Sequence, residues 1–584
     1  MGLSYAHLSS INGRPVGRKQ YYEYIRAQAE NEYSSFMPHY QDIADHIMPR
    51  RYIFNSDEKS NRGKKMNQKI LDSTATLAQR TFRAGMLAGT TSPSRVWSQL
   101  APPDPGMKEF GPVKDYLYTV NRIIHNVFSR TNLYNELGPC FGDLGNFATG
   151  AILMEEDFEN YLRFYSAPLG TYRIALGADL KVNTFMREIR FNVMQIVQKF
   201  GRLKSSGHID WSNFSDQVRI AWENARYLEE VDVVHMIMPN KDHKPGSFRA
   251  KDKKFSSSYY ECDHRTMQDG RDVFLRDSGY DFFPALVPRW EVAGEDTYGT
   301  DCPGMMALGD IRELQLMKKR KSQAVEYMSR PPLKAPVALE NGRTSNLPGD
   351  VTYVDETQTG KYEPVYTVNP RIDHLVGDIQ DIRMIIEKSY FVDLFQSMSA
   401  MPGVQPRTVE EIVERREEKF LVLGPVMQQV YTGLHDPLME NTFNILSRYE
   451  GLLPEPPEEL QGQQVRIEYV SQMAQAQKLV GLAGNERLLN TVVGLGNVDP
   501  SIVHKFNADQ YLDEVADILT TAPGIIRTDE EAAQIREQIA QQQAQQEQIE
   551  AAGQLSQTAK TLAETPIRED TALARLEQLS TVGA

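Results

Sequence analysis

The sequence predicts an α+β protein that is mainly α-helical, with helices at both ends and a strand-rich block between them. Apolar residues recur every three or four positions before about residue 150 and after about residue 300, whereas short alternating runs fill the middle. At 584 residues, 41% hydrophobic and 24% charged, the chain has an ordinary globular composition and the length of several domain-sized units. It therefore buries a sizeable core.

The first part of the chain carries four helical patterns. Pro38 lies inside the first of them and is a candidate break, and Pro49 ends it. Gly89 provides a C-terminal stop for the second. The predicted helices are residues 18–50, 66–89, 112–130 and 132–148.

The middle block reads as short strands bounded by turns, with two short helices among them. The predicted strands are residues 151–155, 161–166, 172–176, 182–190, 231–238, 256–261, 273–276 and 285–291. The predicted helices are residues 192–200 and 216–225.

Two long helices are predicted after this block, and a segment rich in proline and glycine separates them. The first, residues 310–329, ends at Pro331-Pro332, and the second, residues 372–395, is amphipathic. Residues 331–370 lie between them and offer only short strand candidates. The apolar stripe of the second helix includes Ile379, Ile382, Ile386 and Tyr390.

The chain after the second long helix first breaks and then becomes helical again. Residues 396–407 cannot be one helix because they contain Pro402, Gly403 and Pro406. A long helix follows, and Gly424-Pro425 predicts a kink in it. Residues 465–469 are a strand candidate. The last sixty or so residues form a Gln/Ala/Glu-rich segment that reads either as a helix or as a disordered tail.

The sequence offers no catalytic, cofactor-binding or metal-binding signature. GxxxxGK[ST], HExxH, GxSxG and EF-hand patterns do not occur in it. Five carboxylates in one neighbourhood are of the kind that a magnesium-dependent nuclease uses, although a solvated loop before a helix is the favoured interpretation. They are Glu291, Glu295, Asp296, Asp301 and Asp310.

Charge and cysteine usage limit the class of protein further. The formal net charge is −14, whereas a free-standing nucleic-acid binder has a basic excess. Cys140, Cys262 and Cys302 are far apart without CxxC spacing, which predicts free thiols and assembly in a reducing cytoplasm. No secretory signal and no apolar run long enough for a membrane span are expected.

Four consecutive basic residues, 318–321, lie inside the predicted helix 310–329. Because consecutive residues point around most of a helix, the four cannot all face one partner. A solvated face is the ordinary interpretation, and contact of one or two of these side chains with DNA or another partner is the alternative.

The order of these segments resembles the portal family, the head-to-tail connectors of short-tailed, podovirus-type double-stranded-DNA bacteriophages. Four stretches carry the resemblance, and none is a catalytic signature. They are NQKILDSTATLAQRTFRAGMLAGTTSPSRVWSQL (67–100), YGTDCPGMMALGDIRELQLMKKRKSQAVEYMSRPPL (298–333), IDHLVGDIQDIRMIIEKSYFVDLF (372–395) and RTVEEIVERREEKFLVLGPVMQQV (407–430).

The resemblance implies a structural subunit of a ring, usually a dodecamer, at one capsid vertex. It implies a wing in residues 1–300, stem helices in 301–330 and 371–395, and a clip in 331–370. It also implies a tunnel loop in 396–407, a long kinked helix with the rest of the wing in 408–500, and crown or barrel helices with a tail in 501–584.

The resemblance further implies that viral DNA is packaged and ejected through the ring without sequence recognition. The implied partners are identical subunits, the terminase large subunit, tail adaptor or tail tube proteins, and the major capsid and scaffolding proteins. The implied location is the portal vertex of the virion, after assembly in the host cytoplasm. A non-enclosing helical adaptor or scaffold of the virion is the alternative function, and a metal-dependent nuclease is a weaker one.

Three groups of candidate site residues follow, and no catalytic, metal or cofactor residue is among them. The tunnel-loop group is Met398, Met401, Pro402, Gly403, Val404, Gln405, Pro406 and Arg407. The candidate contacts with DNA or the channel are Lys318, Lys321 and Arg407, for which intersubunit salt bridges are the alternative. The stem-packing group is Ile379, Ile382, Ile386 and Tyr390.

Shortening residues 398–405 is expected to leave ring assembly intact and to change DNA packaging or retention. Twelve residues are long for a plain connection between helices, and adaptable methionines suit a segment that shifts against a moving duplex. Electron microscopy checks the ring, and DNA content of particles checks packaging. Normal packaging and retention in the shortened variant would rule out this role for the loop.

Overall fold

The structure is a computed structural model, and it describes most of the chain up to residue 469 and short stretches beyond. The described residues are 10–11, 14–15, 17–51, 67–104, 107, 110–262, 273–329, 333–334, 363–364, 372–399, 423–462, 465–469, 489, 492, 507, 511–512, 532, 534–546, 549 and 553–554. The chain divides into two units. The first comprises residues 1–100, 120–454 and 467–484, and the second comprises 101–119, 455–466 and 485–584.

Helices dominate the start of the chain, as the sequence predicts, but the helix expected at 66–89 begins at Thr74, after a separate 3-10 turn at 67–69. Pro38 does not break the first one, α2, which runs for 30 residues. The buried side chains of Tyr33 and Tyr40 hold α2 against the body on both sides of the proline, so packing outweighs the lost backbone hydrogen bond. The elements are β1 (Ser10–Ile11), β2 (Arg14–Pro15), α2 (Arg18–Ile47), η1 (Asn67–Lys69), α3 (Thr74–Thr90), β3 (Ser98–Ala101), α4 (Gly111–Arg130) and α5 (Leu133–Phe147).

The middle block contains two antiparallel sheets, which confirms the mixed α+β class. The larger sheet has the order β10-β9-β8-β7-β6 and the smaller has the order β11-β4-β5. Their strands are β4 (Ile152–Asp157), β5 (Tyr161–Ser166), β6 (Tyr172–Leu176), β7 (Val182–Asn192), β8 (Glu230–Pro239), β9 (Phe255–Glu261), β10 (Arg276–Tyr280) and β11 (Ala285–Leu286). The short helices are α6 (Val193–Phe200), α7 (Asp216–Glu223) and η3 (Ala250–Asp252).

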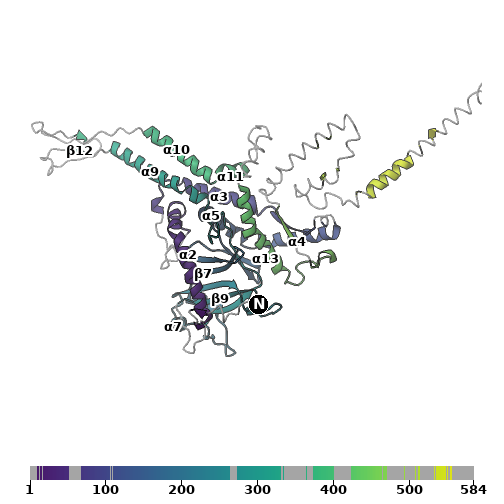
Figure 1. The fold of residues 1–584 in the computed structure, drawn as a ribbon, viewed down its shortest axis with the longest axis horizontal. Coiled ribbons are helices and arrows are strands. Elements are labelled where there is room, and N and C mark those ends of the chain that lie inside the picture. The colour runs from purple at the N-terminus through teal and green to yellow at the C-terminus, as the bar shows by residue number, and fades with distance from the viewer. Residues whose placement is uncertain are drawn as a thin grey trace, which may run out of the picture. The chain divides into compact units, whose positions relative to one another are not determined.

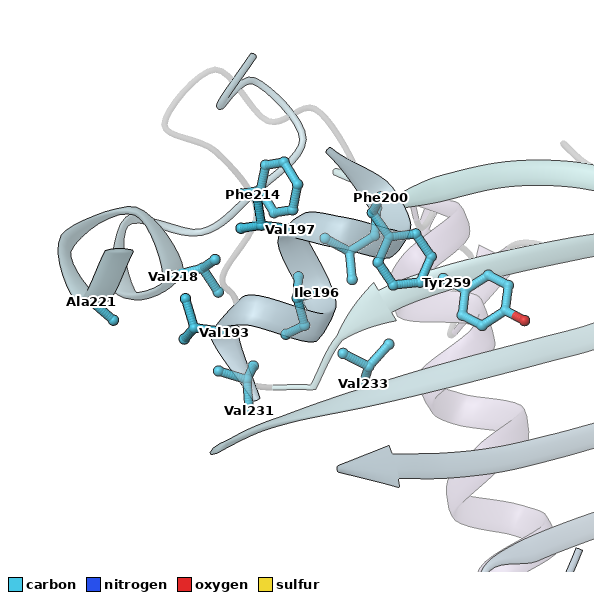
Figure 2. Packing of buried hydrophobic residues seen from close by; sticks show 11 residues of the cluster. Val193, Ile196, Val197, Phe200, Phe214, Val218, Ala221, Val231, Val233 and Tyr259 are labelled. Atoms are coloured by element: carbon cyan, nitrogen blue, oxygen red, sulfur yellow. The ribbon is translucent and has the colours of Figure 1, made fainter. Parts of the chain in front are cut away.

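Both faces of the larger sheet are covered by helices. Alternate residues of β8 point to opposite sides of the sheet, so they show what covers each face. Helix α2 lies against one side of the sheet (Figure 1), and Val234, Met236 and Met238 pack with its Tyr22 there. Val231 and Val233 face the other side, where they meet α6 and α7 (Figure 2). A strand buried on both faces reads as a nearly continuous apolar run, and β8 has that character.

Two strand predictions in this block need correction. Residues 285–291 were expected to form one strand, but the strand is Ala285–Leu286, paired with Leu153 and Ile152 of β4, and Arg289 and Glu291 form isolated bridges. Pro284 and Pro288 flank this pair, and proline has no N–H group to donate to a ladder. The strand expected at 273–276 lies instead at Arg276–Tyr280, in register with β9.

Two long helices follow the sheets, and the second is shorter than the sequence predicts. The expected single helix 372–395 is wrong, because α10 ends at Ser389 and a second helix begins at Val392. Phe391, between them, has a φ of 55°, a left-handed conformation that no glycine or proline signals here. The elements are α8 (Pro303–Met306), α9 (Leu308–Ser329), β12 (Leu333–Lys334), β13 (Glu363–Pro364), α10 (Ile372–Ser389) and α11 (Val392–Ser399).

The described chain resumes as a helix at residue 423, and its irregularity lies at η5, a π-helical turn, Tyr431–His435. The helix continues as α13 (Asp436–Leu446), and η6 (Glu458–Leu460) and β14 (Arg466–Tyr469) follow. The predicted strand at 465–469 is confirmed, since β14 pairs with β3. The predicted kink at Gly424-Pro425 involves residues before 423, which lie outside the described residues.

Two buried histidines are a notable part of the core. His235 of β8 receives a hydrogen bond from Arg187 and meets Ser257, and burial together with the Arg187 charge holds its pKa well below the ordinary value. His435 lies between the rings of Trp97 and Tyr431, and neither ring nitrogen has a hydrogen-bond partner among the described residues. Burial lowers the pKa of His435 to about 3. Both side chains are therefore neutral in the folded chain.

The free energy of unfolding should fall as the pH drops below about 6.5. In this range the two histidines bind protons in the unfolded chain but stay neutral in the folded chain. His435 contributes about 2 kcal/mol of loss between pH 7 and pH 5, because one pH unit corresponds to about 1.4 kcal/mol per proton, and His235 adds a loss in the same direction. His435→Met should remove the contribution of His435 and cost little at pH 7, since no hydrogen bond is removed. Urea unfolding at both pH values measures it, and an unchanged pH dependence in His435→Met would contradict it.

Candidate functional site

The two long helices α9 and α10 form a hairpin that is buried only at its base. They run side by side, and the described pair β12–β13 belongs to the segment between them (Figure 1). Buried side chains of α9 all lie in its first eight residues and end at Gln315. The described side chains of α10 before Ile379 are likewise exposed or half-buried. About half of each helix therefore extends beyond the body.

The four stem-packing candidates all lie on the buried stripe of α10 and its end. Ile379, Ile382, Ile386 and Tyr390 are between 0% and 8% exposed. The α10 helix contacts both α9 and α3, so this stripe joins the hairpin to the helical part of the body. Their role in a stem stays a prediction.

Tyr390 fixes the end of α10 through its ring and its hydroxyl. The hydroxyl donates a hydrogen bond of 2.9 Å to the side-chain oxygen of Asn146, in α5. The ring meets Phe82 of α3 edge-on, with ring centroids 6.2 Å apart. After the left-handed bend at Phe391, Phe395 of α11 also packs edge-on against Phe82. The bend is thus held by aromatic contacts on both sides.

The base of the hairpin meets a buried carboxylate that precedes α3. Asp72 is 5% exposed. Its Oδ2 atom lies 2.5 Å from a guanidinium nitrogen of Arg383 in α10 and 3.5 Å from Nζ of Lys318 in α9. Its Oδ1 atom accepts hydrogen bonds from the backbone and the hydroxyl of Thr74. One carboxylate therefore joins both hairpin helices to α3.

The pKa of Asp72 reflects this competition between burial and its partners. Burial alone would raise the pKa, but hydrogen bonds from Thr74 and Arg383 and the Arg383 charge outweigh it and lower the pKa to about 2. The carboxylate is therefore ionised at any physiological pH, and its ion pairs are permanent features of the folded chain.

The candidate contacts with DNA fall into three different situations. Lys318 is half-buried and forms an ion pair with Asp72 of the same chain. The sequence had suggested DNA or a neighbouring subunit as its partner. Lys321 is half-buried further along α9. Arg407 lies outside the described residues, as do Met401, Pro402, Gly403, Val404, Gln405 and Pro406 of the predicted loop. Met398 lies in α11, so residues 396–399 of the expected loop are helical. Their contacts with DNA stay predictions.

Catalytic arrangements find no support in the described residues. The five carboxylates between residues 291 and 310 are all described, and no group of three or more metal-binding side chains gathers in that part of the chain. Ser257 and His235 are 2.9 Å apart, as in a nucleophile and its base. However, Arg187 donates to Nδ1 of His235, so Nε2 carries the proton and cannot take one from Ser257.

Sequence reasoning missed Asp72, Gln315, Arg383 and Asn146. Asp72 precedes a helix, and such a residue reads as an ordinary cap. Its ionic partners lie more than 240 residues away, a distance that no local pattern reports.

No helix in the described residues is long and apolar enough to cross a membrane.

Comparison with known proteins gives consistent results. The family described as bacteriophage head to tail connecting protein matches residues 19–526. The portal protein of Salmonella phage epsilon15 is 41% identical over 550 residues, which cover 94% of this chain and 96% of the relative. The probable portal protein of Bordetella phage BPP-1 is 36% identical over 550 residues, with 94% and 95% covered.

Among solved structures, a chain of the virion of a native gene transfer agent particle matches 73% of this chain and 90% of its own length. Its identity is 9% and its TM-score is 0.27, which is too low to support a conclusion about the fold.

Tyr390→Phe should lower the free energy of unfolding by about 1–2 kcal/mol, because it leaves the buried oxygen of Asn146 without its donor. Tyr33→Phe is the matched control. Tyr33 is as deeply buried, but its hydroxyl has no hydrogen-bond partner among the described residues, so its loss should change stability by less than about 0.5 kcal/mol. Chemical denaturation measures both variants, and equal effects would refute the anchoring role of the Tyr390 hydroxyl.

Proposed function

This chain belongs to the family of bacteriophage head-to-tail connecting proteins, and we propose from that membership that it is the structural portal subunit of a short-tailed double-stranded-DNA phage. The observation that carries the proposal is sequence identity to two portal proteins along nearly the whole chain. The chain is a structural protein and not an enzyme, in keeping with those relatives.

Identical subunits associate, in this proposal, through exposed apolar side chains of the hairpin, some at its base and some beyond the body. Six large apolar side chains on α9 and α10 are roughly half exposed in the single chain, where a neighbouring subunit could cover them. They are Leu316, Val325, Tyr327, Met328, Met384 and Ile385. Neighbouring hairpins that cover these side chains would close a ring, with a dodecamer as the family expectation.

The remaining parts take their proposed roles from the family. Residues 331–370 form the clip that receives the packaging motor, the terminase large subunit, and later the tail adaptor or tail tube proteins. Residues 396–407 form the tunnel loop. The wing meets the major capsid and scaffolding proteins. The proposed location is the portal vertex between head and tail of the virion, after assembly in the host cytoplasm.

DNA passes through the proposed channel without tight binding. The formal charge of each subunit is −14, so a ring of such subunits repels the phosphate backbone over most of its surface. In the basic run, Lys318 is occupied by Asp72, whereas Lys319 and Arg320 are exposed. The exposed pair is therefore better placed than Lys318 for transient contacts with phosphate.

A non-enclosing helical adaptor of the virion is the competing function. Negative-stain electron microscopy of the purified full chain separates the two. A ring with a central hole supports the portal subunit, and a monomer or an open assembly supports the adaptor.

Met384→Asp combined with Ile385→Asp should abolish rings and leave a folded subunit. Both side chains are about half exposed on α10, so a carboxylate is tolerated in the isolated chain but not against an apolar neighbour. Phe248→Asp is the control, because Phe248 is fully exposed in the β8–β9 connection and far from the hairpin in sequence.

Native mass spectrometry and negative stain read the assembly state, and circular dichroism checks folding. Rings should persist in Phe248→Asp and disappear in the double variant. Rings that persist in the double variant would place the interface elsewhere.

A further inference from the structure

Beside the buried apolar stripe of α10, a small number of polar groups join the hairpin to the body at its base. Oδ2 of Asp72 pairs with Arg383 of α10 and with Lys318 of α9, so both hairpin helices meet at one oxygen atom. The Asp72 side chain is 3% exposed, whereas those of Lys318 and Arg383 are 31% and 38% exposed. A carboxylate this deeply buried is held in place, and its two cations are drawn to it.

Gln315 of α9 provides a second connection to the same point. Its side-chain oxygen accepts the backbone N–H groups of Leu71 at 2.7 Å and Asp72 at 2.8 Å. Its side-chain nitrogen donates to the backbone oxygen of Asp72 at 2.9 Å. The side chain is buried and all its polar atoms are satisfied, so the backbone at 71–72 and α9 are fixed to each other.

A second ion pair between α9 and the body, formed by described residues, is of a different kind. Arg312 reaches Asp42 of α2 at 2.9 Å, but the Arg312 side chain is 59% exposed. Exposed ion pairs contribute little to stability and are screened by salt. Beyond Gln315, α9 has no buried side chain that would hold it to the body. The direction of the hairpin is therefore set near Asp72.

We propose that Asp72 is the positioning residue that fixes the angle at which the α9–α10 hairpin leaves the body, and that this angle selects the number of subunits in the ring. The second part rests on the proposed function. Ring number depends on the angle between neighbouring interfaces, and these interfaces lie on the hairpin in that proposal. A hairpin that pivots at its base accommodates rings of several sizes, whereas a fixed one accommodates a single size.

Asp72→Asn is the primary test, with the full chain as the protein. Asparagine keeps the size and the oxygen that accepts from Thr74, but it removes the charge that holds Arg383 and Lys318 together. Amide hydrogen exchange should become faster by about tenfold or more in residues 308–318, 372–389 and 67–74, and not in β7–β9, because local opening no longer costs a buried ion pair. Native mass spectrometry should show a broader distribution of ring sizes than in the unmodified chain.

Arg312→Gln is the matched control, since it removes an ion pair from the same helix that is exposed rather than buried. It should leave both the exchange rates and the ring size unchanged. Arg383→Gln is the second variant in case Asp72→Asn does not fold, because it leaves Asp72 paired with Lys318 and Thr74. It should shift both measurements in the same direction by a smaller amount.

Three results would overturn the inference. They are unchanged exchange in the hairpin, faster exchange spread evenly over the whole chain, and faster hairpin exchange with an unaltered ring size. A merely stabilising role for Asp72 would lower the melting temperature without changing ring size. If the unmodified chain forms no ring, the proposed function fails, and the exchange measurement still decides whether Asp72 fixes the hairpin.

Discussion

The attachment of a half-buried helical hairpin at its base is the constraint on which the rest of the structure depends. Helices α9 and α10 contribute little apolar burial beyond Gln315 and before Ile379, so packing cannot fix their direction over about half of their length. Beside the buried apolar stripe of α10, Asp72, Gln315 and Tyr390 supply fixed points through an ion pair and hydrogen bonds inside the body. Hydrogen bonds and ion pairs have preferred directions and therefore orient the hairpin, whereas hydrophobic contacts are not directional.

Much of the fold could be predicted from the sequence because its signals are local. The apolar stripe of α10 and the nearly continuous apolar run of β8 locate these elements to within a few residues. The break between α10 and α11 could not be predicted, since Phe391 adopts a left-handed conformation that packing of Tyr390 and Phe395 imposes. The role of Asp72 could not be predicted either, because Lys318 and Arg383 come close to it only in the folded chain.

The function was predicted by the order of segments and not by any reactive group. A structural protein of this kind needs complementary surfaces between subunits. Such surfaces have no short sequence motif comparable with a phosphate-binding loop. The described core is consistent with that view. Two of its buried ionisable groups are examples: His235 beside Arg187 is held neutral, and Asp72 is paired with Arg383 and Lys318.

The half-exposed apolar side chains of the hairpin have a consequence for how the molecule exists outside its assembly. In the proposed ring, neighbours cover Leu316, Val325 and Met384, so the folded form is stabilised by mass action and its heat resistance rises with protein concentration. A dilute, newly synthesised chain lacks that support and exposes these apolar side chains to other chains. Prompt assembly into the proposed ring therefore also limits aggregation.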